Sequence, residues 1–186
     1  MIVNPIVSNE NGRMDIFSMN LDNRIVLLTG EIEDEMATSV ISQLLYLDHN
    51  GHDRISLYIN SPGGCVSAGL AIYDTIQSLK SPVSTICVGR AASMAAVLLS
   101  SGHKGDRVVL PHSEVMIHQP SGGAGGQAED ILIAASHIER LREELNRLLA
   151  ANCDKPVEEI RAATDRDYWM DANEALAFGI ADRMNS

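Results

Sequence analysis

The architecture of this chain follows from Val83-Ser84-Thr85-Ile86-Cys87-Val88-Gly89-Arg90-Ala91-Ala92-Ser93-Met94. Its apolar, β-branched first half predicts a buried strand that stops at Gly89, and the small apolar residues 95–99 predict a helix. Ser93 then stands at a strand–turn–helix junction, where the N–H groups of a helix N-terminus can assist a nucleophile. Serine is also a favoured helix N-cap, which is the commoner reason for finding it there. Its role therefore depends on what the rest of the chain brings to it.

Strand and helix patterns alternate on both sides of this junction. Strands are predicted at 24–29, 55–60, 107–110 and 115–117, and helices at 34–47, 66–79 and 127–152. Two shorter helices follow, one opened by Pro156 and one that runs from the capping box Asp171–Glu174 to Gly179. This alternation predicts an α/β fold with a mostly parallel sheet, and 186 residues without a linker or repeat predict a single domain over residues 1–186.

Two segments are expected to lie outside the compact part of that domain. Residues 1–16 are polar and mixed, with a turn signal at 9–12, and are predicted to be mobile. The helix predicted over 127–152 carries an apolar stripe on an otherwise charged surface and would be about 39 Å long at 1.5 Å per residue. We expect so long a helix to project from the domain and to pack against another chain.

The composition excludes several classes of partner. A formal net charge of −11 argues against binding to nucleic acid or to an anionic membrane surface. Three cysteines, odd in number and without the spacing of metal ligands, predict reduced thiols in a cytosolic protein and no metal site. The sequence shows no secretory signal and no apolar run of the ~18–20 residues that span a bilayer, so we expect a soluble, cytoplasmic protein.

A serine nucleophile needs a base, an acid that orients the base, and donors for an oxyanion. Among six histidines, His118 is the candidate base, because it ends an apolar strand where functional groups gather in parallel-sheet folds. Residues 61–64, Ser-Pro-Gly-Gly, follow a buried strand and can turn backbone N–H groups toward a ligand, although Pro-Gly also marks a plain type II turn. Pattern alone leaves the acid open between Asp165, Asp167 and Asp171, of which Asp171 already serves as a helix cap.

Four motifs resemble the proteolytic subunit of the Clp protease family, in order and at that family's spacing. They are Tyr58-Ile59-Asn60-Ser61-Pro62-Gly63-Gly64, Gly89-Arg90-Ala91-Ala92-Ser93-Met94, Val115-Met116-Ile117-His118-Gln119-Pro120 and Thr164-Asp165-Arg166-Asp167. The likeness runs from about residue 17 to residue 180. It implies a crotonase-like spiral ββα superhelix domain, with residues 127–152 as a projecting handle helix.

The resemblance also implies roles for individual residues. Ser93 would be the nucleophile, His118 the general base and Asp167 the residue that orients it, with the oxyanion held by the N–H groups of Gly64 and Met94. The substrate backbone would be bound by Gly122, Gly123, Ala124 and Gly125. The opposite ring would be contacted by Asp165 and Arg166. The subunit would bind no metal or nucleotide, since a partner AAA+ unfoldase would use the ATP. It would form a homo-oligomer, a double heptameric ring.

The sequence departs from the family where the unfoldase docks. Polar residues occupy three positions that are apolar in the family, namely Ser56, Ser78 and Asn185, although Tyr58 is kept. Each lost apolar side chain removes ~1.5–3 kcal/mol of burial energy. We therefore expect a secondary paralogue that docks an unfoldase poorly alone and works in a mixed assembly with a second Clp proteolytic subunit. Ala95, where the family usually has glycine, is a mild change.

Two other functions fit parts of the pattern. A crotonase-type enzyme acting on acyl-CoA thioesters would share the spiral architecture and the oxyanion loop, but it would not need Ser93, His118 and Asp167 together. A non-catalytic or weakly active ring subunit would keep the fold and the assembly without an aligned triad. The serine peptidase accounts for more of the motifs than either alternative.

Overall fold

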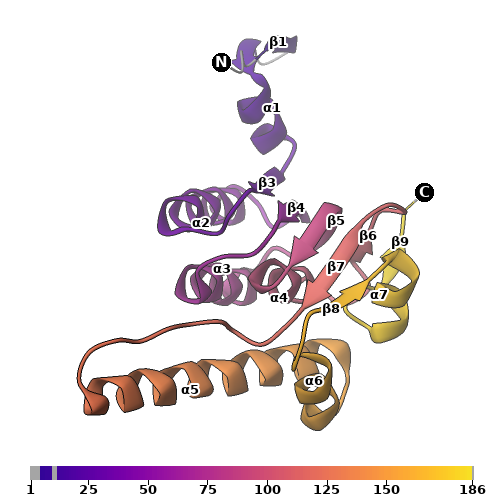
Figure 1. The fold of residues 1–186 in the computed structure, drawn as a ribbon. Helices are drawn as coiled ribbons and strands as arrows, with labels where there is room; N and C mark the ends of the chain where they lie inside the picture. The colour runs from indigo at the N-terminus through magenta and orange to yellow at the C-terminus, as the bar shows by residue number, and fades with distance from the viewer. Residues whose placement is uncertain (1–4, 10–11, 186) are drawn as a thin grey trace.

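The computed structural model describes residues 5–9 and 12–185, a mixed α/β structure (Figure 1). Within these residues the helices are α1 (Ile16–Asp22), α2 (Asp34–His49), α3 (Val66–Ser78), α4 (Met94–Ser100), α5 (Ala128–Cys153), α6 (Val157–Ala163) and α7 (Ala172–Phe178). The strands are β1 (Ile6–Asn9), β2 (Gly12–Asp15), β3 (Ile25–Thr29), β4 (Ile55–Ser61), β5 (Val83–Ala92), β6 (Arg107–Val109), β7 (Glu114–Ile117), β8 (Tyr168–Met170) and β9 (Arg183–Met184).

The main sheet is mostly parallel, as the alternation of strands and helices predicted. Its strand order is β3-β4-β5-β6-β9, every neighbouring pair is parallel, and β7 pairs with the last part of β5. Only β8 runs antiparallel within this sheet, against β7. Helices α2 and α3 pack side by side against it (Figure 1), and α4 is buried along its whole length. The buried apolar residues form one core cluster.

The prediction that the central strand stops at Gly89 is wrong. Strand β5 continues to Ala92 through a bulge, where the pairing with β4 shifts between Ile59↔Cys87 and Ser61↔Ala91. Gly89 has φ +80°, a left-handed conformation that favours glycine, so it bends the strand rather than ending it. Because of this bend, the first half of β5 pairs with β6 and its last residues pair with β7.

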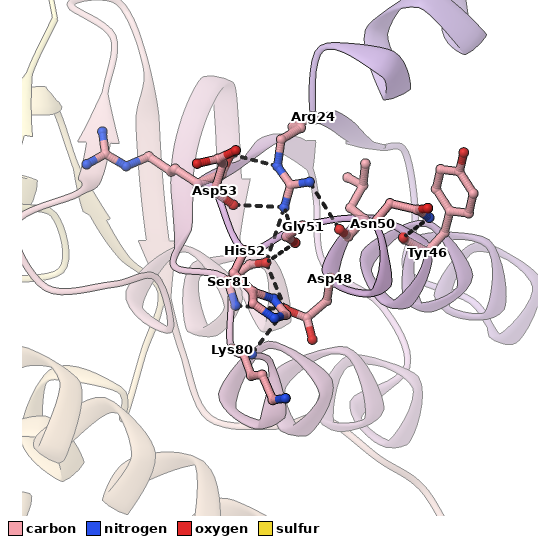
Figure 2. Close-up of polar contacts among 11 residues, drawn as sticks. Arg24, Tyr46, Asp48, Asn50, Gly51, His52, Asp53, Lys80 and Ser81 are labelled. Atoms are coloured by element: carbon pink, nitrogen blue, oxygen red, sulfur yellow. Dashed lines mark hydrogen bonds and ion pairs between the residues drawn. The ribbon is translucent and has the colours of Figure 1, made fainter.

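Arg24 connects several loops at the edge of the sheet where β3, β4 and β5 begin. Its guanidinium donates to the carbonyls of Leu47, Gly51 and Asp53, at 3.0, 3.2 and 2.8 Å (Figure 2). It also donates to the hydroxyl of Ser81 at 3.2 Å. An arginine can satisfy several carbonyls at once because its donors form a fixed planar fork.

The structure describes most of the two segments that were predicted to lie outside the compact part of the domain. Strands β1 and β2 pair antiparallel, with Ile6↔Asp15 and Asn9↔Gly12, so a hairpin stands where residues 1–16 were predicted to be mobile; residues 1–4 and the predicted turn at 10–11 lie outside the described residues. Helix α5 has 26 residues and extends past the sheet, with the segment between β7 and α5 running alongside it (Figure 1). No helix among the described residues is long and apolar enough to cross a membrane.

Candidate active site

Two parallel strands bring Ser93 and His118 to the same edge of the sheet. Strands β5 and β7 pair with Ala92 opposite Met116, so the residues that follow each strand leave the sheet side by side. The N–H of Ser93 donates to the carbonyl of Met116 at 2.8 Å, which fixes its backbone against β7. The carboxyl edge of a parallel sheet is where functional groups collect in α/β folds.

The short antiparallel strand β8 brings Asp167 to the same place. Ile117 at the end of β7 pairs with Tyr168 at the start of β8, so the residues just outside this pair, His118 and Asp167, also face each other. The backbone N–H of Gln119 donates to the carbonyl of Thr164 at 2.7 Å and holds the two segments together beyond the strands. Asp167 is thus placed by pairing between segments some fifty residues apart.

The three side chains form a continuous hydrogen-bonded line. The imidazole Nε2 of His118 lies 2.8 Å from the hydroxyl oxygen of Ser93, and its Nδ1 lies 3.1 Å from Oδ1 of Asp167. The His118 side chain is 25% exposed and that of Asp167 is 62% exposed, so the line runs from a half-buried serine to an open carboxylate. This geometry suits a nucleophile, a base within reach of its proton, and an acid that orients the base.

The backbone of Ser93 argues against a purely capping role. Its φ of 55° and ψ of −125° are unusual for a residue other than glycine and mark local strain. In the described part of the chain its hydroxyl caps no N–H of α4, although Ser93 occupies the N-cap position of that helix. The hydroxyl is turned to His118 instead, and such strain clusters at sites where function requires it.

Of the two glycines after β4, Gly63 lies directly against the serine and Gly64 lies against Ile32. A Cβ on Gly63 would come within 2.7 Å of the Ala92 carbonyl and of the Ser93 Cβ, so only glycine fits there. A Cβ on Gly64 would lie 2.3 Å from the carbonyl oxygen of Ile32. Met94 is the first residue of α4, and first-turn N–H groups have no acceptor within their own helix. The loop and the helix start that were predicted to supply oxyanion donors therefore both border Ser93.

A hollow of about 700 Å³ opens on the side of His118 and Asp167. Its walls include Gly122 and also Asp165 and Arg166. A Cβ on Gly122 would lie 2.7 Å from the Ile138 side chain, so the segment passes close to α5 at that point. The other residues of the predicted substrate segment, Gly123, Ala124 and Gly125, are exposed and do not line this hollow.

A second, much smaller cavity of about 20 Å³ lies on the buried side of the serine, bordered by Ser93, Met94 and His118. Its remaining walls are apolar side chains and one amide, from Val66, Val97, Ile117, Pro120, Leu145, Leu149 and Asn146. The sequence did not single out Asn146. A polar residue between Leu145 and Leu149, on the buried stripe of a charged helix, is the signal that could have found it.

The remaining predicted site residues lie elsewhere. Ser56 is half-buried on β4, Ser78 is exposed at the end of α3, and Asn185 is exposed just after β9.

All three cysteines are free, and burial raises the pKa of the Cys87 and Cys153 thiols to about 11. Hydrogen bonds, first from the Ser67 hydroxyl, lower the pKa of the exposed Cys65 thiol. Within residues 5–9 and 12–185 no three His, Cys, Asp or Glu side chains are grouped to hold a metal ion.

The chain matches a model of a known protein family. The model described as Clp protease matches residues 8–186. The matched range contains every residue of the site, from Gly63 beside the serine to the carboxylate of Asp167, and it spans nearly the whole chain.

Proposed function

This chain belongs to the Clp protease family of serine peptidases, and on that premise we propose that it hydrolyses peptides and unfolded proteins through Ser93, His118 and Asp167. The observation that carries the proposal is the pair of contacts at His118, 2.8 Å to the Ser93 hydroxyl and 3.1 Å to the Asp167 carboxylate. Both distances suit hydrogen bonds without any movement of the side chains.

In the acylation step the Ser93 hydroxyl attacks the peptide carbonyl while Nε2 of His118 takes its proton. Asp167 accepts the hydrogen bond from Nδ1, which keeps the other ring nitrogen free to act as a base and stabilises the imidazolium that forms. His118 then gives the proton to the leaving amine. A water molecule, activated by the same histidine, hydrolyses the acyl-enzyme and regenerates Ser93.

The negative charge on the carbonyl oxygen needs donors that are in place before the reaction. We assign this role to the N–H groups of Gly64 and Met94, which belong to the two backbone segments that border Ser93. Loss of one such donor costs about 3 kcal/mol of transition-state stabilisation in other acyl-transfer enzymes. The chemistry uses no metal or nucleotide of this subunit.

We also propose how the substrate is bound. The segment that contains Gly122, Gly123, Ala124 and Gly125 would pair with the peptide backbone as an added strand, which reads sequence only weakly. The exposure of this segment, and the hollow of about 700 Å³ beside it, support such a role. The small cavity behind Ser93 would take the side chain that precedes the cleaved bond.

For the assembly we propose two stacked heptameric rings of a crotonase-like spiral fold, with α5 as the handle between rings and Asp165 and Arg166 at the contact. The exposed apolar side chains at the start of α5, Ile131, Leu132 and Ile133, support this use of the helix. An AAA+ unfoldase would deliver substrates, helped by a second Clp proteolytic paralogue. We place the protein in the cytoplasm, which the three free thiols favour.

The test compares the wild-type protein with Ser93→Ala. A labelled fluorophosphonate should attach to Ser93 and short fluorogenic peptides should be hydrolysed, and both activities should vanish in the variant while the melting temperature stays the same. Hydrolysis that persists in Ser93→Ala would rule out the proposed nucleophile.

The two other functions predict different results in the same assay. A weakly active ring subunit would hydrolyse peptides only after mixing with a paralogue, and native mass spectrometry of the mixture would show joint rings. A crotonase-type enzyme would turn over acyl-CoA thioesters without labelling at Ser93. The family match and the hydrogen-bonded serine favour the peptidase.

A further inference from the structure

The position of the Asp167 carboxylate depends on its backbone. Among the described residues its only hydrogen bond or ion pair is the contact of 3.1 Å with Nδ1 of His118, and the side chain is 62% exposed. No second donor therefore fixes the carboxylate in front of the imidazole. Its place is set by how firmly the segment 164–167 is held against the end of β7.

Gln119, the residue that follows His118, holds that segment at two successive carbonyl groups. Its backbone N–H donates to the carbonyl of Thr164 at 2.7 Å. Its side-chain amide nitrogen, Nε2, donates to the carbonyl of Asp165 at 2.8 Å. Both acceptors precede Asp167 in the chain, whereas the pairing of β8 with β7 holds the residues that follow it. The carboxylate thus lies between two points of attachment.

The two carbonyl groups differ in what else holds them. Thr164 is 1% exposed, and its N–H and its hydroxyl both bond to the carbonyl of Ile160, at 2.8 and 2.9 Å, so the end of α6 already fixes this residue. The carbonyl of Asp165 also accepts from Arg166 at 2.7 Å, but that guanidinium belongs to the same segment. In the described part of the chain, the Gln119 amide is therefore the one donor to the Asp165 carbonyl from outside the segment.

The backbone of Gln119 is itself constrained, so its side chain has a fixed base. The next residue is Pro120, and a residue before proline is largely confined to extended conformations. Gln119 is also half-buried, and its N–H is already bonded to Thr164. An amide on such a base loses less conformational freedom on binding a carbonyl than one on a mobile loop would.

We propose that Gln119 is a positioning residue that keeps the Asp167 carboxylate opposite His118 by holding the carbonyl of Asp165. This inference rests on the peptidase function proposed above, in which Asp167 orients the base. A hydrogen bond two residues from the carboxylate limits the movement of the segment, and small displacements of a catalytic group are costly for the rate. Gln119 acts through Asp167 and does not bind the substrate.

The experiment removes the amide donor with Gln119→Met, because methionine has nearly the length and shape of glutamine but no N–H group. The kcat for a fluorogenic peptide should fall about 10-fold. The KM should stay within 2-fold of wild type, because the lost bond holds Asp167 and not the peptide.

A double-mutant cycle with Asp167→Ala separates positioning from a general structural role. Without the carboxylate there is nothing for Gln119 to position, so adding Gln119→Met to Asp167→Ala should change kcat by less than 2-fold. All four proteins are assayed with the same peptide, with enough enzyme to measure the slow Asp167→Ala form.

Gln77→Met is the matched control. Nε2 of Gln77 donates to the carbonyl of Ser101 at 2.8 Å, a bond of the same kind and length at the other end of α4 from Ser93. Its removal should leave kcat within 2-fold of wild type. Gln119→Glu is a second variant of the same shape, whose ionised carboxylate can only accept, and it should lower kcat at least as much as Gln119→Met. Melting temperatures report whether each variant is folded.

Either of two results would refute the inference and leave the peptidase function intact. One is a kcat within 2-fold of wild type in folded Gln119→Met or Gln119→Glu protein. The other is a 10-fold loss from Gln119→Met that persists in the Asp167→Ala background, since Gln119 would then act by another route. If wild-type protein cleaves no peptide, or if Asp167→Ala keeps the wild-type kcat, the proposed function itself fails, and the inference fails with it.

Discussion

At the scale of single residues, Asp167 gives the sharpest test of the site, because it is the most exposed of the three side chains. Its carboxylate is 62% exposed and holds His118 through one contact of 3.1 Å. A surface contact of this kind adds little to folding stability, since water screens it. We propose that it orients the imidazole instead, and stability and activity should therefore respond differently when Asp167 is changed.

We expect Asp167→Asn to lower kcat by about 10³- to 10⁴-fold, because the amide can donate to Nδ1 and so stabilise the wrong imidazole tautomer. The melting temperature should change by about 2 °C or less, as for most exposed substitutions. Peptide hydrolysis and thermal denaturation on the same sample check this. A kcat within 10-fold of wild type would show that Asp167 does not orient the base.

The sequence identified some of these residues for physical reasons and could not identify others. Ser93 and His118 follow apolar strands, and such strand ends are visible in a pattern. Asp167 was selected by resemblance alone, because the strand that places it, β8, has only three residues and shows no periodicity. The position of Asn146 beside Ser93 was missed because the cavity that both residues line is formed by several separate elements, which no local pattern records.

At the scale of elements, Asp48 is the acidic residue in the network of hydrogen bonds that joins the loops around Arg24. Oδ1 of Asp48 accepts from the Ser81 hydroxyl at 2.7 Å and from the N–H groups of Ser81 and Lys80 at 2.8 and 3.1 Å (Figure 2). These bonds, that of the Ser81 hydroxyl foremost, hold the pKa of the Asp48 carboxyl below its ordinary value of 3.8. The hydrogen bonds of Asp48 therefore contribute fully to stability only while its carboxyl group is ionised.

The direction of the pH effect follows from that lowered pKa. The contribution is fully present above pH 3.8, the unfolded value, and is lost as the pH falls through the lower folded value. We expect Asp48→Asn to reduce the free energy of unfolding by about 1 kcal/mol at pH 7, because the site is partly exposed to water. Urea denaturation at pH 7 and near pH 3 should show the difference shrinking with acidification. A difference that grows toward acid would contradict this origin.

Helix α5 is the second element with a testable consequence. Its first turns expose Ile131, Leu132 and Ile133 at 42, 60 and 68%, which is costly for a helix that stays alone in water. We expect Leu132→Asp with Ile133→Asp to abolish ring pairing, as measured by light scattering after size exclusion, with little change in helix content. Methionine at both positions is the matched control and should keep the assembly. Unchanged mass in the aspartate variant would remove α5 from the proposed contact.

The long elements were predicted well, as were the short strands β6 and β7 and the short helices α6 and α7, whereas strands β8 and β9 were not. The helices α2, α3 and α5 and the strands β3 and β4 have an apolar periodicity that many residues share. Strands β8 and β9 have three and two residues, and their existence depends on partners far along the chain. The bulge in β5 was missed because a glycine after an apolar run is the usual sign of a strand end, and only the second partner strand, β7, reveals that the strand continues.

At the scale of the whole molecule, the positions of Ser56 and Asn185 bear on how substrates are delivered to the site. Ser56 lies on β4 and Asn185 directly follows β9, and these strands are separated by β5 and β6 in the sheet. Their side chains therefore do not form one compact pocket within a single chain, and we propose that the docking surface is shared between neighbouring subunits. Serine and asparagine there leave a partner loop with little apolar surface to bury.

We expect the homomer to bind a cognate unfoldase weakly, and the triple variant Ser56→Tyr, Ser78→Phe and Asn185→Leu to bind at least 10-fold more tightly. Each apolar side chain that becomes buried contributes ~1.5–3 kcal/mol before the costs of association. Fluorescence anisotropy with the Ser93→Ala form of each protein measures binding without digestion. Tight binding by the unmodified homomer would end the idea that a paralogue is needed for docking.

The strand β8 also has a consequence for the stage of folding at which the proposed site becomes complete. Ser93 and His118 are synthesised before Asp167. Asp167 reaches them only through the three-residue strand that follows it, whose pairing with β7 joins residues 117 and 168. Contacts between such distant residues form late, after local helices and neighbouring strands. A partly folded chain thus lacks the carboxylate that we propose to orient His118, and we expect the site to be complete only when β8 has paired with β7.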